Sequence, residues 1–357
     1  MTPSSTRDLA GRVIPVRTGV EEEHVVADVA WGAGCYAGWS GDQEFADGAG
    51  KLLLVETARY WASRIRIDAD GKGHIEGVIG PDEYHEHVDD NAFTNVMARW
   101  NLRRAAEAAR RDPDGIGRRE PEVWLRAADA LVDGYDPETG LYEQFAGFFE
   151  LEPLVIADVA PRRPVAGDIL LGYERVRSAQ VVKQADVLML HHLVPEELAP
   201  GSLDPDLDCY EPRTAHGSSL SPAVHAALFA RAGRLDEAVS TLAMSARLDL
   251  DESLVSAALG MHAATMGGLW QALVMGFGGI RPSGHALHVD PRMPAAWGEV
   301  RIPVRFHGSR VRVRVNADRL EVRAQPPTLV RVGDDAPARI GSGGRRFRRV
   351  ADRWEPA

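Results

Sequence analysis

The fold class is decided by residues 219–250, which read SLSPAVHAALFARAG and then RLDEAVSTLAMSARLDL. Pro222 suits the first turn of a helix and Ser221 suits its N-cap, so a helix is predicted to begin here. A second helical segment follows after a tight turn, and a third is predicted over 251–275. Repeated helical hairpins predict an α/α toroid or a helical array, while no repeat of fixed period supports a solenoid.

The preceding part of the chain also has the pattern of helices separated by loops. Apolar residues recur at helical spacing at Leu54, Ala58, Trp61 and Ile65. Asn91 is a favourable N-cap for the segment that follows it. Helices are therefore predicted over 21–42, 50–67, 91–111, 121–132 and 181–194, with an irregular connection over 136–177 whose length is typical of functional segments.

The pattern changes near Gly279. Residues 311–315 read VRVRV, an alternation of period two that predicts a half-buried strand. We expect a small antiparallel β domain from 280 to about 340, with its arginines on a solvated sheet face rather than in a nucleic-acid patch. Residues 341–357 are predicted to be a frayed tail. The chain is thus divided into domains 1–279 and 280–357.

Composition bounds the function. The 357 residues are 45% hydrophobic and 26% charged, as in globular proteins, and the formal net charge is -11. That charge argues against general binding to nucleic acid or to an anionic membrane. Only two cysteines are present, which fits a reducing compartment. No signal-peptide core and no stretch of roughly 20 apolar residues is seen, so a cytoplasmic location is predicted.

Residues 77–95 read GVIGPDEYHEHVDDNAFTN and must form a loop, because a Gly-Pro step breaks any helix. Glu83 lies among four other acidic side chains, and neighbouring negative charge favours the protonated form that a general acid needs. An acidic surface loop in which Asp90 and Asn91 cap the next helix explains the same residues. A metal site using His85 and His87 is a third alternative, although their spacing is not that of a helical zinc pair.

A second candidate site lies at 216–219. His216, Gly217, Ser218 and Ser219 precede a predicted helix N-terminus. Backbone N–H groups, two hydroxyls and an imidazole there would suit an anion of phosphate size. The alternative is that the serines only cap the helix.

A third candidate lies in the predicted helix 181–194, where Lys183, Gln184 and Asp186 are polar among apolar neighbours. Lys183 and Asp186 are spaced to pair with each other. A sugar site would use the same groups for hydroxyls, with an aromatic side chain such as Trp61 stacked on the ring. Both interpretations stay open on the residues alone.

Several segments resemble glycoside hydrolase family 65, which includes the inverting maltose, trehalose, kojibiose and nigerose phosphorylases. The resemblance covers about residues 20–325 and keeps the family's order of segments. The matching segments are EEEHVVADVA, ETARYWASR, GVIGPDEYHEHVDDNAFTN, KQADV, YEPRTAHGSSLSPAVHA and GMHAATMGGLWQA.

The resemblance implies a mainly α protein, an (α/α)6 barrel followed by a small C-terminal antiparallel β-sheet domain. It implies that Glu83 is the general acid and that Lys183 and Gln184 contact the transferred glucosyl unit. His216, Ser218 and Ser219 match the phosphate-binding segment. The implied reaction is phosphorolysis of an α-linked glucose disaccharide to β-glucose 1-phosphate and glucose with inversion. Inorganic phosphate is the co-substrate, and neither a cofactor nor a metal is expected.

Three differences from the family pattern qualify this expectation. Gly217 stands where the family usually has aspartate, and Asp90 where it has asparagine. The family's N-terminal β-sandwich and first barrel helices are not matched, so an incomplete barrel is expected. The alternatives are a family hydrolase of the trehalase or kojibiose hydrolase type and an inactive truncated remnant that only binds sugar or a partner. A homodimer is a further expectation.

Overall fold

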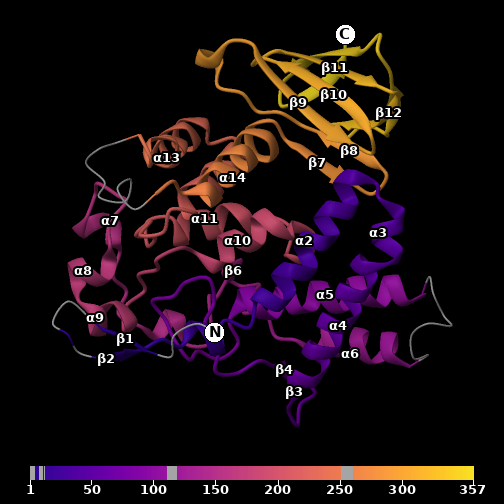
Figure 1. Cartoon of the computed structure of the whole chain (residues 1–357). Coiled ribbons are helices and arrows are strands. Elements are labelled where there is room, and N and C mark those ends of the chain that lie inside the picture. The colour runs from indigo at the N-terminus through magenta and orange to yellow at the C-terminus, as the bar shows by residue number, and fades with distance from the viewer. Residues whose placement is uncertain (1–4, 8–10, 12, 111–118, 251–259) are drawn as a thin grey trace. The chain divides into compact units, whose positions relative to one another are not determined.

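The computed structural model describes residues 5–7, 11, 13–110, 119–250 and 260–357. The chain forms two compact units (Figure 1). Unit 1 comprises residues 1–33 and 49–218, and unit 2 comprises 34–48 and 219–357. The boundary between the units lies within the predicted domain 1–279, so the division at residue 279 stays a prediction. The first nine residues of the predicted helix 251–275 lie outside the described residues.

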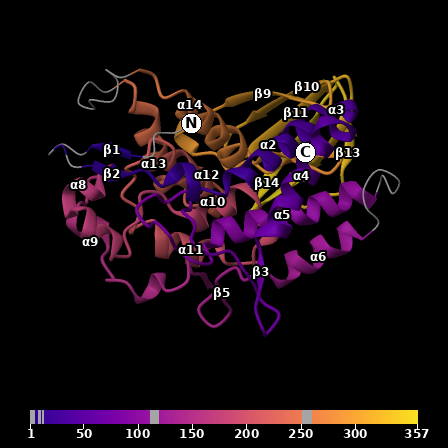
Figure 2. The same cartoon turned by 60° about the horizontal axis from the view of Figure 1, so that its bottom comes forward.

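Helices with buried apolar faces form the body of unit 1. Helix α4 (Ala49–Arg64) buries Ala58 and Trp61, as the apolar spacing predicted, and buries Val55, while Leu54 and Ile65 are only partly buried. Helix α5 (Ala92–Arg110) is buried on most of its surface, and α6 (Glu120–Ala130) runs beside it (Figures 1 and 2). Asn91 caps α5, because its Oδ1 accepts from the N–H of Thr94 at 2.9 Å. The predicted cap is therefore confirmed.

The predicted helix over 181–194 begins late, at Asp186, and α10 runs over Asp186–Leu193. Val182, before it, forms an isolated β-bridge: it donates to the carbonyl of Arg213 at 3.0 Å and accepts from Ala215 at 2.8 Å. This backbone pairing replaces the first helical turn. Lys183 and Gln184 therefore lie in a bend between this pairing and the helix, and not on the helix.

The irregular connection 136–177 is a succession of short elements. Part of it packs on a buried apolar cluster that includes Tyr84, Ile156, Val176, Val181 and Ala215. The connection thereby packs against Tyr84, in the loop that carries Glu83. Its elements are the end of β5 (Tyr135–Asp136), β6 (Leu141–Tyr142), η1 (Phe148–Glu150), α7 (Ile156–Val159), α8 (Gly167–Leu171) and α9 (Tyr173–Arg177).

The other elements of unit 1 are short, apart from α2, which continues into unit 2. They are β1 (Ser5–Arg7), β2 (Val13–Pro15), α1 (Thr18–Glu21), α2 (Val25–Ser40), β3 (Arg66–Ile67), β4 (Gly73–His74), η2 (Pro195–Glu197) and α11 (Leu203–Tyr210). Among the described residues, no helix combines the length and apolarity needed to cross a membrane.

Unit 2 begins with helices. Helix α12 (Ser221–Ala232) carries Pro222 in its first turn, as predicted, and ends at Gly233, whose φ is 81°. Ser221 is the first helical residue and not the N-cap, because Leu220 occupies that position without a side-chain hydrogen bond. The other helices are α3 (Gln43–Asp47), α13 (Leu235–Arg247), α14 (Ala263–Gln271) and the π-helical turn η4 (Ala272–Phe277).

Two sheets form the C-terminal part of unit 2, with strand orders β15-β14-β11-β10-β9 and β13-β12-β8-β7. The strands pair antiparallel, which confirms the prediction. The exception is β8 with β12, which pair parallel. In β10, valines 311, 313 and 315 are buried and the arginines between them are exposed. The elements are β7 (Ile280–Ser283), β8 (Ala286–Val289), η5 (Ala295–Trp297), β9 (Val300–Phe306), β10 (Ser309–Val315), β11 (Arg319–Gln325), β12 (Thr328–Val332), β13 (Ala338–Ile340), β14 (Arg345–Val350) and β15 (Arg353–Pro356).

The prediction of a frayed tail over 341–357 is wrong. Strand β14 pairs with β11, placing Phe347 opposite Leu320, and β15 pairs with β14. Phe347 and Trp354 are each 4% exposed. Burial of these two large aromatic side chains holds the C-terminal segment in the sheet.

Candidate active site

Glu83 lies at the tip of a loop closed by backbone hydrogen bonds. Val78 and Val88 donate to each other's carbonyls at 2.9 Å, which brings the two sides of the loop together. Two non-glycine residues of the loop, His87 and Asp90, adopt positive φ values of 56° and 51°. Asp90 is fixed there by His74, whose Nδ1 lies 2.7 Å from its carboxylate.

Lys183 lies directly against Glu83. Its Nζ is 2.8 Å from Glu83 Oε1, and the two side chains are 25% and 42% exposed. Gln184 donates from its amide to the carbonyl of Pro81. The structure therefore brings Lys183 and Gln184 to the loop of Glu83, although Lys183 and Glu83 are 100 positions apart in the chain.

Asp82, next to Glu83, anchors this arrangement from inside. The side chain is 1% exposed, and its Oδ1 accepts from the backbone N–H of Lys183 at 2.8 Å. Its Oδ2 accepts from Gln144 at 3.1 Å and lies 2.6 Å from Nδ1 of His85. Because Asp82 holds the backbone of Lys183, the adjacent side chains of Glu83 and Lys183 face each other.

A second buried carboxylate, Asp186, holds the same loop. It accepts from the N–H of Asp82 at 2.7 Å and from Nδ2 of Asn91 at 2.7 Å. Burial, reinforced by the negative charge of Asp82, raises the pKa of Asp186. Gly80 is required beside it, because a Cβ there would lie 2.1 Å from Asp186 Oδ2.

The alternative pairing of Lys183 with Asp186 is wrong. Lys183 pairs with Glu83, and Asp186 is engaged by Asp82 and Asn91. The cause is that Lys183 lies in the bend before α10, which removes the helical spacing on which that pairing relied.

The metal alternative is also not supported. Both ring nitrogens of buried His85 are engaged, Nδ1 with Asp82 and Nε2 with the carbonyl of Ala179 at 3.0 Å. Burial disfavours the charged imidazolium, but the Asp82 carboxylate, the carbonyl of Ala179 and the charge of Asp186 together outweigh it, so the pKa of His85 is raised. Within residues 13–110, 119–250 and 260–357, no three His, Cys, Asp or Glu side chains form a group that could hold a metal ion.

The predicted phosphate segment passes beside Lys183. A Cβ at Gly217 would lie 3.1 Å from the hydroxyl of Tyr84 and 3.7 Å from Cγ of Lys183. His216 is 1% exposed and has a positive φ of 53°. His216 and Ser218 belong to unit 1, while Ser219 begins unit 2. Their role toward phosphate stays a prediction.

Trp61 does not fit its predicted role. The side chain is 0% exposed and packs inside α4's buried face, with its ring edge-on to Tyr60 at 5.1 Å between centroids. A side chain that is covered on all sides offers no face on which a sugar could stack. The helical periodicity, which placed Trp61 among the core residues, therefore predicted its position correctly, and the sugar-stacking role is wrong.

Glu22 is a residue of this neighbourhood that the sequence reasoning missed. Partial burial, and then the nearby charge of Glu83, raises its pKa, while His24 and Lys183 act in the opposite direction. The sequence signal was present in the run Glu21–Glu23, which was interpreted only as the acidic start of a helix.

Comparison with known families agrees with this geometry. Residues 7–271 match the family model for the glycosyl hydrolase family 65 central catalytic domain. Residues 280–336 match the model for the C-terminal domain of the same family.

Curated relatives give the same result. The chain is 35% identical to kojibiose phosphorylase of Halothermothrix orenii, over 83% of this chain and 40% of that protein. It is 36% identical to kojibiose phosphorylase of Escherichia coli, over 82% of this chain and 40% of the relative. It is 33% identical to α,α-trehalose phosphorylase of Thermoanaerobacter brockii, over 81% of this chain and 39% of that protein.

A solved structure, "Putative kojibiose phosphorylase from human microbiome", superposes with a TM-score of 0.80 at 26% identity. The superposition covers 91% of this chain and 50% of that one. The mainly helical fold of the (α/α)6 type with a C-terminal antiparallel sheet domain is thereby confirmed. The chain spans about two fifths of the length of the curated relatives that it matches. It belongs to glycosyl hydrolase family 65.

Proposed function

We propose that this chain is the catalytic region of a disaccharide phosphorylase. The reaction would transfer the glucosyl unit of an α-linked glucose disaccharide, of the kojibiose, trehalose or maltose type, to inorganic phosphate. The products would be β-glucose 1-phosphate and glucose. The observation that carries the proposal is the convergence of Glu83, Lys183 and the 216–218 segment in one neighbourhood. Relatives named as kojibiose and trehalose phosphorylases support it.

Glu83 is assigned as the general acid that protonates the glycosidic oxygen as the bond breaks. In the structure its carboxylate forms an ion pair with Lys183, and an ion pair keeps the proton on the amine. Glu83 must therefore part from Lys183 and take up a proton from solvent before it can act as an acid. Lys183 and Gln184 are assigned to hydroxyls of the glucosyl unit, so binding of the sugar would draw the lysine away and free the acid.

Phosphate is assigned to His216, Ser218 and Ser219. As an anion it can attack the anomeric carbon without activation, so no second catalytic carboxylate is required, unlike the inverting hydrolases in which a base activates water. The mechanism proposed here assigns no step to a cofactor or a metal.

Further parts of the proposal concern organisation. The division into domains 1–279 and 280–357 is supported by the family models, which end at 271 and begin at 280. A cytoplasmic location rests on the low cysteine content, two in 357 residues, which fits a reducing compartment. Homodimerisation rests on the resemblance alone.

The test is to follow glucose 1-phosphate and free glucose from kojibiose, trehalose and maltose, with and without phosphate. Both this chain and the longest open reading frame that contains it are assayed. Phosphate-dependent glucose 1-phosphate is expected, with a loss of about 100-fold or more in Glu83→Gln. Release of glucose at the same rate without phosphate would identify a hydrolase. Unchanged activity in Glu83→Gln would refute the assignment of the acid.

A further inference from the structure

Charge is distributed very unevenly along this chain. Residues 280–357 contain 16 arginines, no lysine and 8 acidic residues, a formal net charge of +8. Residues 1–279 contain 25 basic and 44 acidic residues, a net charge of −19. Such asymmetry within one chain indicates that the basic part meets an anionic partner or ligand.

The arginines of the five-stranded sheet fall into two groups. At one end, Glu299 lies within 3.1 Å of both Arg301 and Arg314, so charge there is balanced. At the other end, Arg305, Arg310 and Arg312 make no ion pair within the described part of the sheet. One end of the same exposed face is therefore neutralised and the other is left positive.

The register of the strands places arginines opposite arginines at this positive end, and their repulsion destabilises the sheet there. Arg310 of β10 lies directly opposite Arg305 of β9, and Arg312 lies directly opposite Arg323 of β11. Like charges directly opposite each other on neighbouring strands destabilise a sheet. Of these four, Arg323 alone has a carboxylate at ion-pair distance among the described residues, Glu321 at 2.9 Å, and Arg346 shares it.

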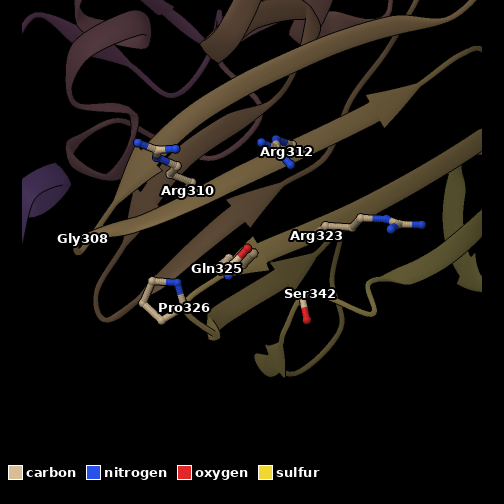
Figure 3. A pocket seen from close by; sticks show the side chains of 8 residues that line it. Gly308, Arg310, Arg312, Arg323, Gln325, Pro326 and Ser342 are labelled. Atoms are coloured by element: carbon tan, nitrogen blue, oxygen red, sulfur yellow. The ribbon is translucent and has the colours of Figure 1, made fainter.

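A hollow of about 480 Å³ lies at this end of the sheet. Figure 3 shows Arg310 and Arg312 on one strand and Arg323 on the next, with Gln325 and Ser342 also lining the hollow. The loop that carries Ser342 lies close to the strand, because a Cβ at Gly344 would be 2.7 Å from Cγ of Arg323. The volume is that of a small-molecule site.

We propose that this hollow binds a small anion carrying two or more phosphate groups, with Arg310, Arg312 and Arg323 as its charged ligands. Guanidinium groups match phosphate oxygens in a bidentate geometry, and an all-arginine set favours that chemistry over a diffuse lysine field. Gln325 and Ser342 supply neutral hydrogen-bonding groups. A bound polyphosphate relieves the repulsion between the facing arginines.

A small ligand is favoured over a nucleic acid because the positive region is local. Glu299 and Glu321 interrupt it on the same sheet, and the whole chain carries a charge of -11. A nucleic-acid strand needs a continuous basic path along its backbone.

The experiment is calorimetric titration of the full chain with inorganic phosphate, pyrophosphate and ATP at fixed ionic strength. Saturable binding of one ATP per chain is expected, with affinity rising from phosphate to ATP. The double variant Arg310→Gln/Arg312→Gln is expected to bind ATP about tenfold or more weakly. Arg301→Gln/Arg314→Gln is the matched control, since it removes the same charge from the neutralised end, and its affinity should stay within about twofold of the parent.

Several outcomes would overturn the proposal. Equal weakening in both double variants would show a general charge effect and no site. Poly(U) binding more tightly than ATP, with the same loss in the Arg310/Arg312 variant, would assign the face to nucleic acid. Unsaturable binding would also refute a site. Far-UV circular dichroism and thermal unfolding of each variant establish that the sheet is intact, and the titration requires no catalytic activity.

Discussion

Asp82 provides a demanding test of how the Glu83 loop is held. Replacing it by alanine removes the acceptor of four donors, the N–H groups of Tyr84 and Lys183, Nδ1 of His85 and Nε2 of Gln144. Each buried donor left without a partner costs about 1–3 kcal/mol. Loss of the repulsion between Asp82 and Asp186 offsets part of this sum. The free energy of unfolding is therefore expected to fall by about 3–5 kcal/mol.

Asp82→Asn removes the negative charge of this side chain but keeps its size and one hydrogen-bond acceptor. Both ring nitrogens of His85 face acceptors, Nδ1 the carboxylate of Asp82 and Nε2 the carbonyl of Ala179, an arrangement that favours the doubly protonated imidazole. With a neutral partner, His85 can lose the Nδ1 proton and accept from the new amide. Gln144 can turn its amide, whose buried Oε1 has no hydrogen-bond partner in this part of the structure. The expected loss is about 1–2 kcal/mol.

The assay is urea unfolding at pH 7, combined with hydrogen exchange of the peptide that contains Lys183. Because the amide of Lys183 donates to Asp82, its exchange should accelerate in Asp82→Ala and much less in Asp82→Asn. Asp136→Ala is the control, since Asp136 accepts from Glu138 and Thr139 in an exposed turn, and its effect should be far smaller. A loss below about 1 kcal/mol in Asp82→Ala would refute the anchoring role.

Two further predictions concern the same loop and its surroundings. Gly80→Ala places a Cβ 2.1 Å from Asp186 Oδ2 and is expected to destabilise the protein by about 1–3 kcal/mol in urea unfolding. The same substitution at Gly32, whose added Cβ would meet nothing within 4 Å in helix α2, should be neutral or slightly stabilising; equal effects would contradict the steric argument. The raised pKa of His85 predicts a pH effect: its contribution to stability is fully present below the unfolded value of 6.5 and is lost as pH rises through the folded value. Unfolding free energies at pH 6, 7 and 8 should therefore fall more steeply in the parent than in His85→Gln, and parallel curves would contradict the assignment.

The sequence by itself determined the local elements. Apolar residues at helical spacing predicted α4, Asn91 predicted the start of α5, and the VRVRV alternation predicted β10. Each of these depends on neighbours a few positions apart, which is the range over which periodicity and capping act. The family segments were also legible, because they are short, ordered runs of residues.

Tertiary structure decided which distant groups meet. Pairing of Val182 with Ala215 replaced a predicted helical turn by a β-bridge and a bend, in which Lys183 lies against Glu83. Burial of Trp354 holds the C-terminal segment in the sheet. These outcomes rest on contacts between segments far apart in the chain, whose gain in burial and hydrogen bonding overrides local preference.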